Sequence, residues 1–184
     1  MSGKNAEGFG VSEVIVIGPD GATPAFDATV EGAVASVAFT KVQIVPSLDT
    51  SIYASGDSLH TAVLEFPDAV AAGGGAYVES MVIVDGAAQS QPCELWLFDQ
   101  TVTPAAANAA HSISDIDAAK CLGVISSGVY YASALNSVSV AKGVSLPVKA
   151  AGTGTSLFGI LVTRGTPTYA ASSLTVSLIL SRVG

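Results

Sequence analysis

Few residues in this sequence have the chemistry of a catalytic or metal-binding site. The chain has two histidines, His60 and His111, and two cysteines, Cys93 and Cys121. None of the four lies in a Cys-x-x-Cys motif or a Cys/His cluster of the kind that binds zinc. The sequence also lacks the Gly-x-Ser-x-Gly elbow that would support a Ser/His/Asp triad. We therefore expect a structural role for His60, which begins an apolar strand, and buried thiols that pack as small apolar groups, with a disulfide left open.

Two closely spaced carboxylates, Asp115 and Asp117, follow Ser114. A serine before a helix, with an acidic residue three positions later, satisfies free backbone N–H groups, and acidic residues suit the positive end of the helix dipole. A calcium loop would need further oxygen ligands in register. The pattern therefore favours one short helix over a metal site or an acid/base pair.

Glycine-rich and aromatic residues offer two further possibilities for ligand binding. The stretches 73–76 and 152–156 lack the lysine of a phosphate-binding loop and lead into no helix, so we interpret both as turns. Trp96, Tyr130 and Tyr131 have the residue types of a sugar-binding platform. Trp96 lies inside an apolar strand, which favours a core position, and the adjacent tyrosines point to opposite faces of a strand. We predict no catalytic, cofactor-binding or metal-ligating residue, and no enzyme.

The composition is that of a folded, acidic protein. Hydrophobic residues make up 49% and charged residues 12% of the 184 residues, which allows a sizeable core. Seven scattered Lys and Arg residues stand against 15 Asp and Glu residues, a net charge of −8, so we exclude nucleic acid as a direct ligand. The acidic balance suits solubility or a basic protein partner.

The chain shows neither a signal peptide nor a membrane span. Its start, MSGKNAEGFG, lacks the basic and apolar regions of a signal peptide. Residues 121–141 carry no charged side chain, but serine and glycine dilute their hydrophobicity below that of a membrane span. We expect a protein that is made in the cytosol and enters no membrane.

Alternation of apolar and polar residues predicts β-strands through most of the chain. Within residues 76–84 we expect the more buried face to be Val78, Ser80, Val82 and Val84. The same alternation gives Leu174, Val176, Leu178 and Leu180 one face. Other runs rich in β-branched residues end at Val45, Phe66, Ser126, Gly143 and Arg164. With Gly/Pro turns between them, about eight strands predict an all-β fold, an antiparallel β-sandwich of jelly-roll type with one short helix.

The domain organisation follows from where this patterning begins. We assign residues 42–184 to the β-sandwich domain and residues 1–41 to an extended N-terminal arm. After the apolar run 14–18, the arm is rich in small residues and has few large apolar groups, so it can build little core of its own. Such an arm would contact another copy or the edge of a partner.

A long loop follows the apolar strand at residues 95–98. Leu95 and Leu97 point to one side and the two aromatic residues to the other, so this strand is expected to be apolar on both faces. Loops of this length often carry function. Because His111 has no visible partner in the sequence, we expect a covering loop in which His111 is a surface or turn residue.

Several segments together form a longer pattern. They read PSLDTSIYASGDSLH, LEFPDAVAAGGGAYVESMVIVD, ELWLFDQTVTPAAANAA, SDIDAAKCLGVI and SLPVKAAGTGTSLFGILVTRGTPTYAASSLTVSLIL. This pattern resembles a family of small virion structural proteins of tailed bacteriophages. The family shows a DTxxYAxGD start, a GGxGxxxSxxxxD strand pair, an LxxLFFD-like strand, a DNAAF…D…K loop and helix, and an LPVKA…LY…LVTxGTPTY ending. The corresponding residues are Asp49, Tyr53, Gly56, Asp57, Gly74, Ser80, Asp85, Phe98, Asp99, Asn108, Asp117, Lys120, Pro147, Lys149, Gly165, Pro167 and Tyr169.

The resemblance covers about residues 46–181, with two departures. His111 stands where the family tends to have an aromatic residue, and Trp96 replaces a smaller apolar one. The resemblance implies a non-enzymatic structural component of a tailed-phage particle, above all a capsid decoration or cement protein that stabilises the shell through lattice contacts. The implied location is the virion, after synthesis in the host cytoplasm.

The partners implied are the major capsid protein or other virion proteins and further copies of the chain in a homo-oligomer, with no nucleic acid and no membrane. The alternative is a tail-associated or surface-glycan-binding module that uses Tyr53, Tyr130 and Tyr169. A depolymerase would need two carboxylates about 5–10 Å apart in a groove.

Overall fold

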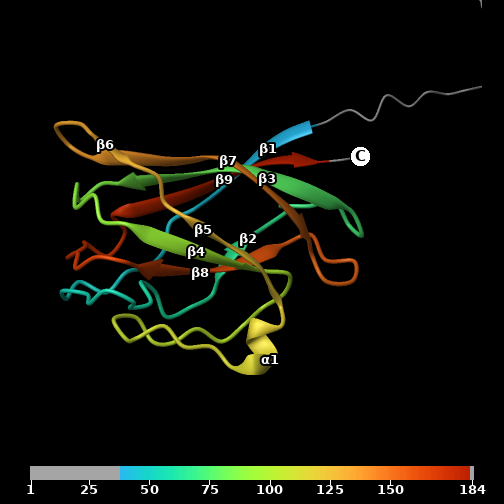
Figure 1. The fold of residues 1–184 in the computed structure, drawn as a ribbon, viewed down its shortest axis with the longest axis horizontal. Helices are drawn as coiled ribbons and strands as arrows, with labels where there is room; N and C mark the ends of the chain where they lie inside the picture. The colour runs from blue at the N-terminus through green and yellow to red at the C-terminus, as the bar shows by residue number, and fades with distance from the viewer. Residues whose placement is uncertain (1–37, 183–184) are drawn as a thin grey trace, which may run out of the picture. The chain divides into compact units, whose positions relative to one another are not determined.

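The computed structural model describes residues 38–182, which form two antiparallel β-sheets and one helical turn (Figure 1). The five-stranded sheet has the order β1-β9-β3-β7-β6, and the four-stranded sheet has the order β2-β8-β4-β5. The elements are β1 (Ala38–Ile44), β2 (Leu64–Phe66), β3 (Gly75–Asp85), β4 (Cys93–Phe98), α1 (Asp115–Ala118), β5 (Cys121–Ser126), β6 (Tyr130–Ala132), β7 (Ser137–Lys149), β8 (Leu157–Thr163) and β9 (Leu174–Arg182). The predicted all-β class is confirmed.

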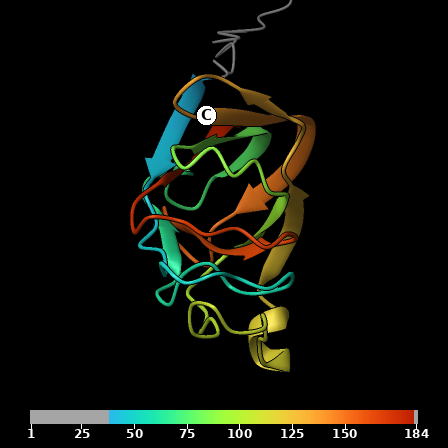
Figure 2. The same cartoon turned by 90° about the vertical axis from the view of Figure 1, so that its left-hand side faces the viewer.

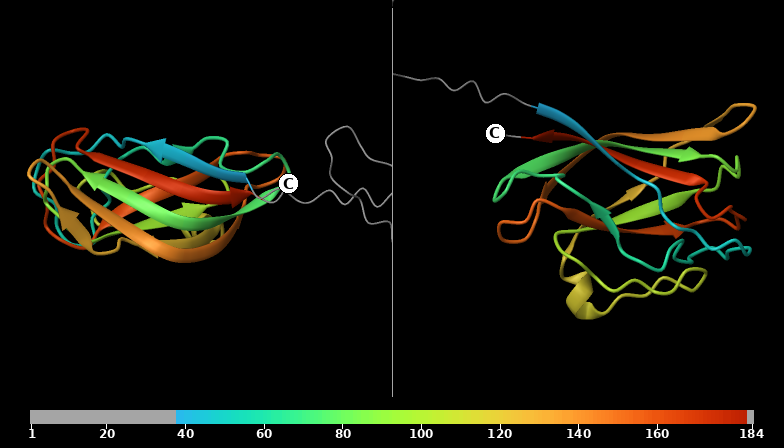
Figure 3. Two further views of the ribbon diagram at one scale, coloured as in Figure 1. Left: turned by 90° about the horizontal axis from the view of Figure 1, so that it is seen from above. Right: turned by 180° about the vertical axis from the view of Figure 1, so that it is seen from behind.

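Strands that follow one another in the sequence mostly lie in opposite sheets. The chain changes sheet at each step from β1 to β4, and again from β5 to β6, from β7 to β8 and from β8 to β9. Strands far apart in the sequence therefore become neighbours, and β1 pairs with β9 from Ala38↔Arg182 to Ile44↔Val176. The two ends of the described chain thus lie side by side in one sheet (Figure 3).

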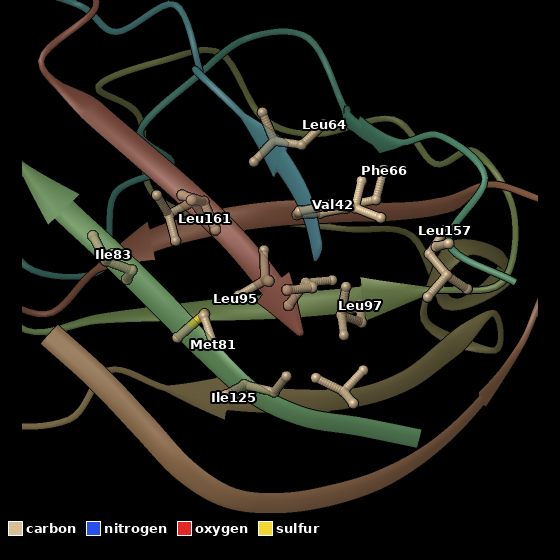
Figure 4. Packing of buried hydrophobic residues seen from close by; sticks show 14 of the residues in the cluster. Val42, Leu64, Phe66, Met81, Ile83, Leu95, Leu97, Ile125, Leu157 and Leu161 are labelled. Atoms are coloured by element: carbon tan, nitrogen blue, oxygen red, sulfur yellow. The ribbon is translucent and has the colours of Figure 1, made fainter. Parts of the chain in front are cut away.

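The main core lies between the two sheets (Figure 4). From β9, alternate residues point into it and are fully buried: Leu174, Val176, Leu178 and Leu180. From the four-stranded sheet, Phe66, Leu95 and Leu161 meet them with no exposed surface. Each such side chain stabilises the fold by about 1.5–3 kcal/mol relative to exposure.

The buried face of β3 changes at Glu79. Val78 and Ser80 pair with consecutive residues of β9, so Glu79 is an extra residue that forms a β-bulge. The buried residues of β3 are Ala76 and Val78 before the bulge, and Met81, Ile83 and Asp85 after it. The prediction of one buried face is right for Val78 and wrong for Ser80, Val82 and Val84, because one inserted residue turns every later side chain to the other face.

The first strand of the sandwich begins before residue 42. Residues 38–41, which the sequence patterning places in the arm, pair with β9 as part of β1. The strand predicted to end at Val45 is confirmed as β1, but the predicted domain boundary at residue 42 falls inside it. Val42 is the buried residue of β1, whereas Phe39 and Lys41 before it are exposed on an edge strand. The rest of the predicted arm, residues 1–37, lies outside the described residues.

The predicted short helix is confirmed as the single turn α1. The Ser114 hydroxyl accepts a hydrogen bond from the Asp117 backbone N–H at 3.1 Å. Lys120 forms an ion pair with Asp117 at 2.7 Å, and β5 begins directly afterwards. The carboxylates therefore begin a helix, as the capping pattern predicts.

Candidate functional site

The loop between β4 and α1 covers the outer face of the four-stranded sheet. Phe98 and the β8 residues Ile160 and Val162 form a second apolar cluster with Val102 of this loop, and Ile113 packs against it. The loop and α1 lie together beside this sheet in Figures 1 and 2. Strand β4 is thus apolar on both faces and the loop is a covering one, as predicted.

His111 has a partner that the sequence did not reveal. Its ring packs against that of Trp96, with centroids 4.8 Å apart, and its backbone N–H donates to the Gly56 carbonyl at 2.8 Å. Burial, and then the nearby Arg164 guanidinium, lower the pKa of His111. His111, expected as a surface or turn residue, is half-buried. Trp96, expected in the core, is also half-buried, and it packs against the second apolar cluster on the outer face rather than between the sheets.

Ser58 lies beside His111, which places a hydroxyl within reach of an imidazole. The Ser58 Oγ to His111 Nδ1 distance is 3.5 Å. Ser58 is fully buried, and its backbone N–H and carbonyl bond Ala109 and Asn108 of the covering loop. A catalytic serine must reach the carbonyl carbon of a substrate, and the loop closes this one off. The contact therefore attaches the loop to the turn that precedes β2.

An ion pair borders the covered face. Glu94 on β4 and Arg164 after β8 approach to 2.6 Å, and the guanidinium lowers the pKa of the Glu94 carboxyl. The side chains are 23% and 41% exposed, so the pair contributes at most about 1 kcal/mol. Trp96 Nε1 and His111 Nε2 are buried and have no hydrogen-bond partner among the described residues.

His60 is a buried connector between two segments. Its Nε2 accepts the Leu161 backbone N–H at 2.8 Å, and its Nδ1 lies 2.6 Å from the Ala62 carbonyl, so Nδ1 carries the proton. Burial lowers the pKa of His60 to about 4. Both ring nitrogens are thus occupied by backbone groups, which is the structural role expected of this histidine.

The three tyrosines of the glycan-binding alternative are turned away from solvent. Tyr53 and Tyr169 are 1% and 3% exposed, with ring centroids 6.2 Å apart. Tyr130 is half-buried, with its hydroxyl 3.6 Å from the Cys93 sulfur, whereas its neighbour Tyr131 is 67% exposed. The opposite orientations of the adjacent tyrosines are confirmed. A glycan platform built from Tyr53, Tyr130 and Tyr169 is wrong, because the first and last lie in the core.

Several of the residues that carry the resemblance to phage virion proteins hold turns in place. Tyr53 donates its hydroxyl to the Leu59 carbonyl at 2.9 Å, Asp57 accepts the Ala54 N–H at 2.7 Å, and Gly56 has a left-handed φ of 99°. The fully buried Asp85 accepts the N–H groups of the residues two and five positions later at 2.9 and 2.7 Å. These side chains fix turns between strands.

Both cysteines are free thiols. Cys93 is buried against Tyr130, and burial raises the pKa of its thiol to about 11. A thiol held protonated in this way is a poor nucleophile at neutral pH. Cys121 is half-buried and packs against the covered outer face.

A groove of about 570 Å³ runs along the sandwich edge beside β1 and β2. Segments 44–49 and 60–65 line it together with Ala107. Its carboxylates are Asp49 and Glu65, and the ring of His60 at its wall is already bonded to backbone on both nitrogens. The groove is large enough for a small ligand but presents few polar groups that converge on one point.

Comparisons with known proteins assign the chain to no family. No protein-family model matches it, and no curated protein matches it. Within residues 38–182, no cluster of three or more His, Cys, Asp or Glu side chains has the arrangement of a metal site. In the same residues, no helix has the length and hydrophobicity needed to cross a membrane. The function is therefore inferred from the residues and from their geometry.

Proposed function

We propose that the chain is a non-enzymatic structural component of a tailed-phage particle, and specifically a capsid decoration protein. The proposal depends mainly on one observation, which is that residues carrying the resemblance to phage virion proteins have structural roles in this fold. Tyr53, Asp57, Asp85 and Tyr169 are buried and hold turns or fill the core. A pattern made of such residues follows the architecture, so the likeness over about residues 46–181 supports a shared fold, and the structural role is proposed by analogy with that family.

The strand order supports the jelly-roll part of the proposal. Apart from β6, the sheets read β1-β9-β3-β7 and β2-β8-β4-β5, with four strands each, and all sequence neighbours except β4 and β5 lie in opposite sheets. A double Greek key of eight strands has this kind of order, and it occurs in capsid domains. We infer that β6 is an addition at the edge of a jelly roll.

The chemistry of the polar groups supports a non-enzymatic role. Ser58 is enclosed, both ring nitrogens of His60 are bonded to backbone, and Cys93 is a buried thiol. These side chains serve the fold in the arrangement described. The proposed partners are the major capsid protein or other virion proteins, with many copies holding a symmetric lattice through individually weak contacts.

The stoichiometry of purified particles tests this proposal. Quantitative mass spectrometry of virions of the phage that encodes the chain measures its copy number relative to the major capsid protein. We expect a fixed ratio that corresponds to one set of sites on every capsomer. Absence from the particle would contradict the proposal, and a few copies per virion would favour the tail-associated alternative.

A further inference from the structure

One edge of the sandwich is formed by a continuous piece of chain. Strand β5 is the outermost strand of the four-stranded sheet and β6 is the outermost strand of the five-stranded sheet. Residues 127–129 join them, and a short turn leads from β6 into β7. We call residues 121–136 the β5–β6 edge; the β6–β7 hairpin at its end projects from the body of the sandwich (Figure 1).

The β5–β6 edge combines exposed apolar side chains with a lack of charge. Of nine large apolar side chains that are exposed in the described residues, four lie here. They are Val124, Val129, Tyr131 and Leu135, with exposed fractions of 44%, 74%, 67% and 83%. Residues 121–141 contain no Asp, Glu, Lys, Arg or His, in a chain with a net charge of −8. Val124 shares the outer face of the four-stranded sheet with its partner Trp96, whereas Tyr131 and Leu135 lie on the β6–β7 hairpin of the other sheet. Exposed apolar side chains without neighbouring charge, as on this hairpin, are typical of a protein contact surface.

The backbone of β6 is also available for pairing. Among residues 38–182, Tyr130–Ala132 pairs with β7 on one side only, so the N–H and C=O groups on its other side have no strand partner there. Edge strands are commonly protected by charged residues or proline. Strand β1 has Lys41 and β2 has Glu65 followed by Pro67, whereas β6 has neither kind of protection.

We propose that the β5–β6 edge binds a second copy of this chain about a two-fold axis. Two copies that each carry a net charge of −8 repel one another, and the repulsion is smallest when they approach through the surface without carboxylates. A positively charged partner would instead bind a surface that carries carboxylates. A two-fold axis beside β6 places the same three-residue strand antiparallel to itself, as an isologous contact requires.

In this dimer the two five-stranded sheets join through β6. Tyr131 and Leu135 from each copy cover apolar surface of the other, because both project from the hairpin that forms the contact. The inference rests on the edge alone and does not depend on the proposed function. A dimer in solution that is absent from virions would contradict only the proposed function. A monomer that decorates virions would contradict only this inference.

Sedimentation equilibrium of the full chain tests the dimer. We expect a concentration-dependent mass that rises from 18.3 kDa toward twice that value. Because the contact is uncharged while the copies repel, raising the salt concentration should strengthen association through screening. A mass of one chain at every concentration and every salt level would overturn the proposal.

Charge placed on the edge locates the contact. Tyr131→Glu and Leu135→Lys should each weaken dimerisation roughly tenfold or more, since a charge would be buried without a partner. Leu135 lies in the turn outside the strands, so its variant keeps the test valid if Tyr131→Glu disturbs β6. Circular dichroism spectra should be unchanged in both.

Two matched controls complete this test. Phe39→Glu on β1, at the opposite edge of the five-stranded sheet, and Ile52→Glu, beside Thr168, alter side chains that are 71% and 67% exposed and lie outside the β5–β6 edge. Both should leave the dissociation constant within about twofold of the unaltered chain. Equal weakening by the controls, or no effect of the edge variants on a chain that does dimerise, would place the contact elsewhere and overturn the proposal.

Discussion

At the scale of single residues, the histidines have structural roles that differ in kind. His60 is a buried neutral ring bonded to backbone on both nitrogens. His111 packs its ring against Trp96 and ties the covering loop to the sheet. The structural role of His60 was predicted, but the strand expected to begin there is shorter, because β2 begins at Leu64. The role of His111 was not predicted, because the contact joins residues that lie on opposite sides of a long loop and no local spacing reports it.

His60 makes the stability of the protein depend on pH. Its folded-state pKa of about 4 lies below the usual value of about 6.5, so the folded state favours the neutral ring. The contribution of His60 to stability is complete above pH about 6.5 and is lost as the pH falls through about 4, by roughly 3 kcal/mol in all. Urea unfolding measured between these pH values should show this loss. A His60→Gln variant should be less stable at neutral pH and show a flatter profile; an unchanged profile would contradict the buried neutral ring.

The contact between Trp96 and His111 predicts an order of mutational effects. Trp96→Ala should destabilise the fold by about 3 kcal/mol because it empties the space beneath the loop. His111→Ala should cost about 1 kcal/mol, more than an isolated surface residue. The double variant should cost less than the sum by about 0.5–1.5 kcal/mol, the usual coupling of two packed rings. Additive effects in denaturant unfolding would show that the two rings do not interact.

At the scale of elements, the β-bulge in β3 determines which side chains reach the core. Glu79 is the extra residue, and the buried positions change from Val78 to Met81 and Ile83 across it. The bulge joins two strand segments whose apolar residues lie on different alternating positions. Together these segments bring a continuous apolar surface against β9 and the opposite sheet.

The bulge and an uninterrupted alternating pattern predict opposite orders of mutational cost at residues 81 and 82 of β3. Met81 is 1% exposed, so Met81→Ala should cost about 3 kcal/mol through cavity formation. Val82 is half-buried on the outer face, so Val82→Ala should cost less than about 1 kcal/mol. Thermal unfolding of the two variants distinguishes the registers. A larger loss for Val82→Ala would mean that β3 has no bulge at Glu79.

The elements show which features of the fold were predictable. The strand β9, the cap at Ser114 and the two apolar faces of β4 follow from period two, from capping chemistry and from an apolar run, which are all local signals. The bulge at Glu79 was missed, and the boundary between arm and sandwich was placed at residue 42, inside β1. The bulge and the place of β1 in the sandwich both depend on pairing with β9, which lies far along the chain.

The candidate site likewise has some features that the sequence predicted and others that it did not. The residue types correctly indicated that the two acidic residues after Ser114 begin a helix. Sequence reasoning placed Tyr53 and Tyr169 among ligand-binding aromatics because they lie in loop-like segments. In the fold both side chains are buried, and the two rings lie close together in the core. The uncharged stretch at residues 121–141 was noticed only as a poor membrane span. That this stretch forms one edge of the sandwich can be recognised only from the strand order.

At the scale of the whole molecule, residues 38–182 form a β-sandwich whose buried polar side chains bond to its own backbone. Exposed apolar side chains lie at its edges. The outer face of one sheet is covered by a loop, and the β5–β6 edge is uncharged. Such a molecule is suited to repeated contacts between proteins. The proposed role in a particle uses the same property on a symmetric lattice.

The predicted arm provides a test at this scale. Its residues 1–37 lie outside the described residues, and the first strand of the sandwich begins at Ala38. Deleting residues 2–36 should leave a folded sandwich, with an unchanged circular dichroism spectrum, that binds capsids at least roughly tenfold more weakly, because an arm adds contacts on a partner. Fluorescently labelled protein and stripped capsids measure the binding. Full occupancy by the truncated protein would show that the arm makes no such contact.

Electron cryomicroscopy of the virion would show whether the chain is a structural component of the capsid, as proposed. We expect density that fits the two-sheet fold of residues 38–182 on the outer surface of the shell, at every symmetry-equivalent position. A shell without this density, in virions that infect normally, would refute the proposed role.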